Sequence, residues 1–140
     1  MSRLYLIFII LIACKSTPPQ IGGCANLESD LKTDWQIGTS YPMVTDTLVY
    51  KLNHQYKDCF IGKDSSSIFK LLGKKYNLEL PEGRKLCANK DGLKFSIEYI
   101  MRTPRHPYDH SDGYMLELLI DSSAIVRCVN VLKVENRPFE

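Results

Sequence analysis

The sequence predicts an α+β domain in which a two-helix hairpin packs against a three- or four-stranded antiparallel sheet. Two observations predict this class. Apolar residues recur at helical spacing as far as about residue 73, whereas from about residue 77 they alternate with polar residues as in strands. Helices that precede a run of strands, instead of alternating with them, are typical of domains that pack helices on one face of an antiparallel sheet.

A short helix is expected first, over Asn26–Gln36. Its apolar residues Leu27, Leu31 and Trp35 are spaced four apart, as on one side of an amphipathic helix. The glycine, serine and proline between residues 38 and 42 then end the helical pattern. We interpret Trp35 as an anchor of the core.

The two-helix hairpin is expected between residues 46 and 73. Asp46 or Thr47 can cap its first helix, which ends at Gly62, and Asp64 or Ser65 can cap the second. On the helical wheel, the apolar side of the first helix contains Leu48, Val49, Leu52, Tyr56, Cys59 and Phe60. The apolar side of the second, which ends at a glycine, contains Ile68, Leu71 and Leu72.

Strands are expected in the remainder of the chain. Asn77–Leu80 is a short strand that a proline ends, Lys85–Ala88 forms a further fragment, and Ile125–Val134 returns after a turn at residues 121–123. Two longer strands between them each have one apolar face, made by Leu93, Phe95, Ile97, Tyr99 and Met101 in one and by Tyr114, Leu116, Leu118 and Ile120 in the other. Such alternation predicts that the opposite face of the sheet meets solvent.

Residues 1–13 have the anatomy of a secretory signal, with Arg3 ahead of an apolar run from Leu4 to Ala13. This run is about half of the roughly 20 residues that a membrane-spanning helix needs. The end of the run and the residue after it, Leu-Ile-Ala-Cys14, resemble the lipobox of bacterial lipoproteins. That resemblance implies that the Cys14 sulfur receives a diacylglycerol and that Cys14 becomes the first residue of the mature chain. An ordinary secretory signal and a buried core segment are the alternatives.

The proline, glycine and polar residues that follow predict a lipidated flexible tether over residues 14–25 and a single domain over residues 26–140. Removing thirteen residues, among them one basic residue and no acidic one, leaves 127 of the 140 residues and lowers the formal charge from +2 to +1. A near-neutral chain without a basic stripe argues against nucleic acid as a partner. Lys15 follows Cys14 where some bacterial lipoproteins have an aspartate that retains them at the inner membrane, so we expect the periplasmic face of the outer membrane.

The segment from Cys59 to Gly73, with the sequence CFIGKDSSSIFKLLG, resembles a signature of small envelope lipoproteins of the BamE/SmpA kind and of related domains with the fold of the β-lactamase inhibitor protein. In that signature a glycine and a polar cap introduce a short helix that ends in Leu-Gly. Lys74 and Lys75 stand where the family usually has a proline. The resemblance implies two helices against an antiparallel sheet and a role in binding other envelope proteins, without catalytic residues.

Four cysteines remain once Cys14 is assigned to the lipid: Cys24, Cys59, Cys87 and Cys128. An even number in an exported chain is compatible with two disulfides in any of three pairings, among which we favour Cys59 with Cys87. Buried free thiols are the alternative at Cys59 and Cys128, which lie on apolar faces. Zinc is disfavoured because no two cysteines are two to four residues apart.

The connection between the two long strands, residues 103–113, gathers two imidazoles and two carboxylates, which belong to His106, Asp109, His110 and Asp112. These groups are ligands of zinc and other divalent ions. Histidines four apart converge on one metal on a helix, however, and Pro104 and Pro107 exclude a regular helix here. We interpret the segment as a solvated hairpin loop without a metal or other cofactor, and keep metal binding as the alternative.

No catalytic motif stands out. There is no Gly-x-Ser-x-Gly elbow, and Ser67-Ile68-Phe69-Lys70 fits Ser-x-x-Lys without its companion motifs. The sequence therefore predicts a membrane-anchored envelope lipoprotein, not an enzyme, that binds another envelope protein as an assembly accessory, inhibitor or immunity factor. The exposed sheet face and the 103–113 loop are expected to make the contacts, with Arg105 and Tyr108 as anchors because these residue types dominate binding hot spots. A periplasmic protein that binds a small ligand or metal through the same loop is the alternative.

Overall fold

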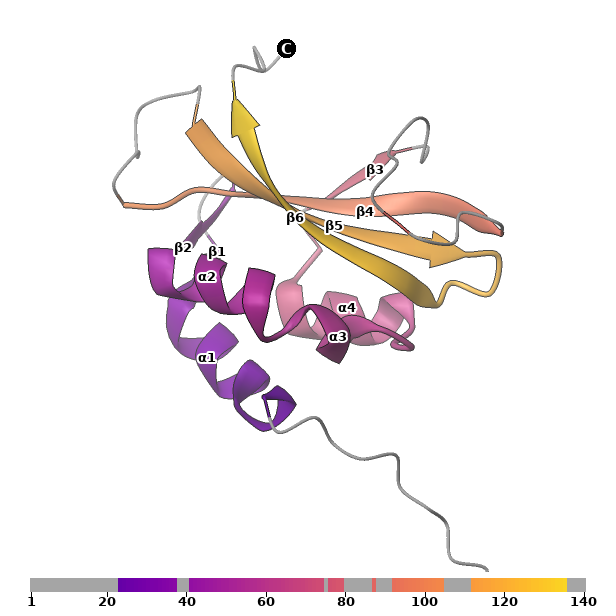
Figure 1. Ribbon diagram of the computed structural model, residues 1–140, viewed down its shortest axis with the longest axis horizontal. Helices are drawn as coiled ribbons and strands as arrows, with labels where there is room; N and C mark the ends of the chain where they lie inside the picture. Colours follow the sequence, from indigo (N-terminus) through magenta and orange to yellow (C-terminus); the bar gives the residue numbers. More distant parts are fainter. Residues whose placement is uncertain are drawn as a thin grey trace, which may run out of the picture.

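The computed structural model describes residues 23–37, 41–74, 76–79, 87, 92–104 and 112–135. Within these ranges, four α-helices form a layer beneath a four-stranded antiparallel sheet, and a sheet of two short strands lies at one end (Figure 1). The predicted α+β class is confirmed. The predicted leader and most of the 103–113 loop lie outside the described residues.

The helical layer begins earlier than expected. A 3₁₀ turn, η1 (Cys24–Asn26), leads into α1 (Leu27–Asp34), so the folded part starts within the stretch assigned to the tether. A disulfide between Cys24 and Cys59 explains the earlier start, since it fixes the chain at residue 24.

Trp35 leaves the expected helix and begins β1 (Trp35–Ile37), which pairs with β2 (Pro42–Val44). Its ring N–H donates to the Leu72 carbonyl at 3.2 Å, and its ring packs edge-on against Tyr99 at 5.7 Å between centroids. This tertiary packing outweighs the local helical pattern. The role of Trp35 as a core anchor agrees with its 7% exposure.

The helix expected from residue 46 to residue 62 is divided into α2 (Asp46–His54) and α3 (Lys57–Phe60). The division arises because the Lys51 carbonyl accepts from the backbone N–H groups of both Gln55 and Tyr56, which interrupts the regular ladder. The cap of α2 is Thr45, whose side chain accepts from the Leu48 N–H, one residue before the expected position.

Helix α4 (Ser65–Leu72) follows the sequence prediction. Its N-cap Asp64 accepts from the backbone N–H of Ser67 at 2.8 Å, and Gly73 ends it. Gly73 has φ +86° and ψ −177°, a conformation that is essentially restricted to glycine. The turn from α4 toward the sheet therefore depends on this residue.

The main sheet has the order β3-β4-β5-β6, with all neighbours antiparallel. Its strands are β3 (Asn77–Glu79), β4 (Leu93–Met101), β5 (Asp112–Asp121) and β6 (Val126–Glu135). Of the fragment expected over Lys85–Ala88, only Cys87 lies within the described residues. The core between the two layers joins the predicted inward residues of β4 and β5 to the helices, and includes Leu48, Leu52, Phe60, Ile68, Ile97, Tyr99, Met101, Leu116, Leu118 and Ile120.

The outer face of the sheet differs from the expectation. Its centre is buried instead of solvated, and the buried side chains there are Ser96, Glu98, Met115, Glu117, Leu119 and Asn130. Cys87, itself 6% exposed, is bonded to Cys128 of β6 on this face. The sequence did carry a signal for this arrangement, since residues 114–120 are apolar except for Glu117, and a nearly continuous apolar run is typical of a strand that is covered on both faces.

Candidate functional site

The four cysteines other than Cys14 form two disulfides, Cys24–Cys59 and Cys87–Cys128. The Cα atoms are 5.5 Å apart in the first pair and 6.1 Å in the second, both within the usual range for a disulfide. The pairing favoured from the sequence, Cys59 with Cys87, is wrong. Cys59 lies on α3 in the helical layer, whereas Cys87 lies on the opposite face of the sheet, so the sheet separates the two side chains.

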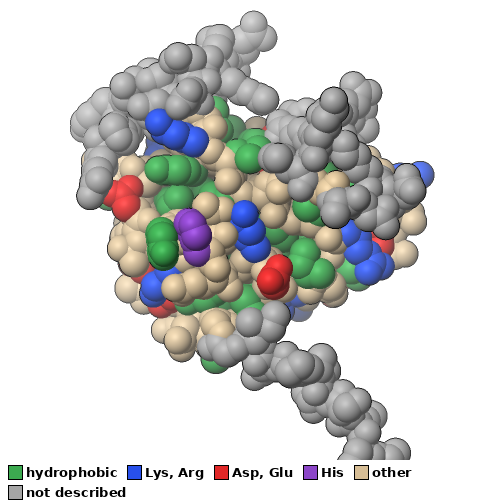
Figure 2. Space-filling view, viewed as in Figure 1, with side chains coloured by type: hydrophobic (Ala, Val, Ile, Leu, Met, Phe, Trp, Pro, Cys, Tyr) green, Lys and Arg blue, Asp and Glu red, His purple; other side chains and the backbone are tan. Residues whose placement is uncertain are grey.

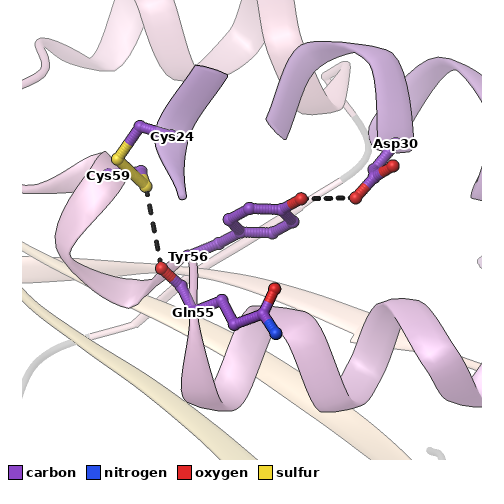
Figure 3. The surroundings of a disulfide bond; sticks show 5 residues. All are labelled: Cys24, Asp30, Gln55, Tyr56 and Cys59. Carbon is purple, nitrogen blue, oxygen red and sulfur yellow. Dashed lines mark hydrogen bonds between the residues drawn. A yellow bond between two sulfur atoms is a disulfide. The ribbon is translucent and has the colours of Figure 1, made fainter. Parts of the chain in front are cut away.

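Beside the first disulfide, the side chain of Asp30 joins α1 to the rest of the helical layer (Figure 3). The hydroxyl of Tyr56 donates a hydrogen bond to Asp30 Oδ2, and the ammonium group of Lys51 lies 2.7 Å from the same oxygen. These contacts link residues 21 and 26 positions apart in the sequence. Helix α1 is thus held by a covalent bond in the turn that precedes it and by a charged hydrogen-bond network at Asp30.

The network changes the acidity of both of its titratable oxygens. The hydrogen bond from Lys51 and then that from Tyr56 lower the pKa of Asp30 below its ordinary value. Burial, followed by the hydrogen bond to Asp30, raises the pKa of Tyr56 to about 12. At neutral pH the phenol is therefore a donor and the carboxylate an acceptor, which is the arrangement that the contact requires.

A second polar cluster lies on the buried outer face of the sheet. Glu98 and Glu117 are directly opposite in the register of β4 and β5, and Asn130 is opposite Glu117 on β6. The Asn130 amide donates to Glu117 Oε2 at 3.0 Å and lies 3.9 Å from the Cys87 sulfur. The Ser96 hydroxyl contacts Glu98 Oε1 at 3.4 Å. The contacts of Asn130 therefore join β5 and β6 to the second disulfide, on a face that alternation alone had assigned to solvent.

Most of the residues predicted to form a site lie outside the described ranges. These are Cys14, Arg105, Tyr108 and, within the loop, His106, Asp109 and His110, whereas Asp112 is placed only as the first residue of β5. Within the described residues, no group of three or more His, Cys, Asp or Glu side chains is arranged to hold a metal ion. The strand ends on either side of the loop are described. Met101 of β4 pairs with Tyr114 of β5, so the loop joins two neighbouring antiparallel strands, as expected.

The exposed side of α2 displays an aromatic pair that sequence reasoning missed. Tyr50 is 58% exposed, and its ring stacks on that of His54, with 4.3 Å between centroids. The Nδ1 atom of His54 also lies 2.9 Å from the Tyr50 carbonyl. Figure 2 shows an imidazole beside apolar side chains on this face of the molecule. The sequence could have predicted this contact, because residues four apart on a helix, as Tyr50 and His54 are, are neighbours.

Comparison with known proteins gives no relative: no family model, no curated protein and no solved structure matches the chain.

The described residues contain no helix that combines the length and the apolar character required to span a bilayer.

Replacing both cysteines of the first disulfide, with Cys24→Ala and Cys59→Ala together, is expected to lower the free energy of unfolding by about 2–4 kcal/mol. The reason is that the bridge closes a loop with a sequence separation of 35 and restricts the unfolded chain. Urea denaturation of the purified protein measures the change. Peptide mapping without reductant should find Cys87 joined to Cys128 in both proteins, and recovery of a Cys59–Cys87 peptide from the parent chain would contradict the structure.

Replacing Asp30 with asparagine is expected to remove an acid-dependent part of the stability. Because folding lowers the pKa of Asp30, its contribution is fully present above the ordinary aspartate pKa, near 3.9, and is lost as the pH falls through the lowered folded value. The stability difference between parent and variant should therefore be largest above about pH 5 and should shrink toward pH 2. Asp58→Asn, which removes an exposed carboxylate from α3, is the control. An Asp30→Asn difference that does not vary with pH would contradict the network.

Proposed function

We propose that the protein is a bacterial envelope lipoprotein, anchored through a lipid on Cys14, whose folded domain binds another envelope protein and carries out no catalysis. The observation that carries the proposal is the Cys24–Cys59 disulfide, together with the position of Cys24 ten residues after the predicted lipid site, Cys14. Disulfides persist in oxidising compartments such as the bacterial periplasm and are rare in reducing cytosol. Two disulfides and an export signal in one chain support the same compartment independently.

The same disulfide sets the distance between the domain and the membrane. Ten residues lead from Cys14 to Cys24, and a chain of that length spans at most about 36 Å when fully extended. Cys24 belongs to the helical layer, at the end of the molecule remote from the sheet (Figure 1). A lipid on Cys14 therefore keeps the helical layer nearer the bilayer and directs the sheet away from it.

The binding role is supported by the residues at the end of the sheet where the 103–113 loop joins β4 to β5. β4 and β5 extend to the 103–113 loop, whose Arg105 and Tyr108 are of the types that dominate protein interfaces. Next to the start of that loop, the Arg102 guanidinium lies 4.7 Å from the centre of the Tyr41 ring. The resemblance of residues 59–73 to the BamE/SmpA signature agrees with a binding role. The outer sheet face is not proposed as a contact surface, because its centre is buried.

The anchor is tested by labelling cells with a radioactive or alkyne-bearing fatty acid. The parent chain is expected to carry the label and to sediment with membranes, whereas a Cys14→Ala chain should lose the label. The double variant Cys24→Ala with Cys59→Ala is the matched control, since it removes two cysteines but leaves Cys14. Equal labelling of the parent and the Cys14→Ala chain would overturn the anchor.

The partner site is tested by crosslinking in intact cells. Arg105→Ala combined with Tyr108→Ala is expected to reduce the yield of a heterologous crosslinked complex at least about tenfold, because truncating an interface anchor typically costs about 2 kcal/mol or more. The matched control is Lys94→Ala with Leu78→Ala, which truncates two exposed side chains away from the loop. Unchanged capture by the loop variant would show that the contacts lie elsewhere.

A further inference from the structure

The most exposed large apolar side chains that the structure describes belong to two short strands. Ile37 of β1 is 62% exposed and Leu78 of β3 is 59% exposed. β3 pairs directly with β4, and β2, the partner of β1, contacts β4 at Arg102. Both apolar side chains therefore lie near β4, although the sequence separates them by forty-one positions.

Two aromatic rings lie beside Leu78 on the helical side of the sheet. The register of β3 places Leu78 opposite Ile97, whose side chain is in the core. Tyr76, two residues before Leu78, has its ring centre 6.0 Å from that of Tyr99, another core residue, and so points to the same side. The Phe69 ring of α4 stacks on Tyr76 with 4.6 Å between centroids. With Ile37, these side chains form what we call the β3 apolar surface, which consists of Ile37, Phe69, Tyr76 and Leu78.

The backbone beneath this surface is held in one arrangement. The side chain of Ile37 lies against Gly73, where a Cβ atom would be 3.1 Å from Ile37 Cδ1. The ring N–H of Trp35 donates to the Leu72 carbonyl at 3.2 Å, and the Tyr99 hydroxyl donates to the Gly73 carbonyl at 2.8 Å. A surface that is already ordered loses little conformational entropy when it binds a partner.

Positive charge lies next to the β3 apolar surface. Lys70 follows Phe69 on α4, Lys74 follows one turn later, and both are exposed. Neither ammonium group forms an ion pair with a carboxylate of the described residues. From Ser65 to Leu78 the sequence has three lysines and no acidic residue. The charge that complements this side of the domain is therefore negative.

We propose that the β3 apolar surface binds an acidic amphipathic segment of another protein. Apolar side chains of the segment cover Ile37 and Leu78 and contact the two rings, while its Asp or Glu side chains pair with Lys70 and Lys74. Exposed apolar patches with a polar rim mark interaction sites, and aromatic residues are enriched in them. Complementary charges at the rim select the partner and orient it.

A protein segment suits this surface better than a bilayer does. Phe69 and Tyr76 are half-buried, so their rings are less exposed than the side chains of Ile37 and Leu78 beside them. Single side chains of a bound segment can pack against such rings, as the anchors of protein interfaces do. The proposal also extends beyond the proposed function, since it uses no residue of the 103–113 loop and does not depend on a lipid. Leu78→Ala is therefore expected to weaken binding at this surface without changing capture through the loop.

The test uses the full chain with Cys14→Ala, so that neither a lipid nor a detergent competes for the surface. The probes are fluorescein-labelled peptides of leucine and glutamate, one with leucine at helical spacing and one with leucine at alternate positions. Matched peptides carry lysine in place of glutamate. Fluorescence anisotropy should show binding of a glutamate peptide and weaker binding of its lysine counterpart, and added salt should reduce the difference because it screens the exposed charges.

Ile37→Ala combined with Leu78→Ala is expected to weaken binding of the glutamate peptide at least about tenfold, as truncating interface anchors does. The matched control is Tyr50→Ala with Ile61→Ala, which truncates the two other exposed large apolar side chains of the described chain. It should leave binding unchanged. Since all four side chains are exposed, both variants are expected to fold, which urea denaturation checks.

Charge reversal tests the choice of an acidic partner. Lys70→Glu with Lys74→Glu should reverse the preference, so that the lysine peptide binds more tightly than the glutamate peptide. Lys57→Glu with Lys63→Glu changes the net charge by the same amount at other positions of the helical layer and should keep the original preference.

Three results overturn the proposal: no binding of either glutamate peptide, equal binding of the lysine peptides, or equal weakening by the two alanine variants. Vesicles of phosphatidylglycerol and of phosphatidylcholine test the bilayer. Binding to phosphatidylglycerol that requires Ile37 and Leu78, without binding of a peptide, identifies a membrane contact and also overturns the proposal. None of these results bears on the lipid at Cys14, which fatty-acid labelling tests separately.

Discussion

The central strand β5 must be buried on both faces, and this constraint decides how the rest of the chain is arranged. The helices cover the face that carries Leu116, Leu118 and Ile120. On the other face Met115, Glu117 and Leu119 are each at most 5% exposed, and Cys87 is joined to β6 there. The Cys87–Cys128 disulfide adds stability to a small domain with one modest core. The buried polar row is accommodated because Asn130 donates to Glu117.

The first disulfide acts at the other side of the molecule, where the chain enters the fold. It joins η1 to α3, and the Asp30 network joins α1 to α2 and to the residue that precedes α3. These bonds make α1 part of the layer instead of an extension of the tether. For a chain anchored at Cys14, the consequence is a domain held close to the bilayer with its sheet directed away from it.

Because the centre of the outer sheet face is buried, the proposed partner is expected to contact the 103–113 loop instead of that face.

The sequence by itself determined the α+β class, the caps and ends of α4 and the inward residues of β4 and β5, because these depend on local spacing and on residues such as Asp64 and Gly73. Tertiary structure decided the disulfide pairing, since the sheet lies between Cys59 and Cys87, and it moved Trp35 from a helix into β1 to reach the Leu72 carbonyl. It also buried the outer face, which alternation had assigned to solvent. The spacing of residues along the chain shows which of them lie on the same face. Whether that face is buried depends on contacts between residues far apart in the chain.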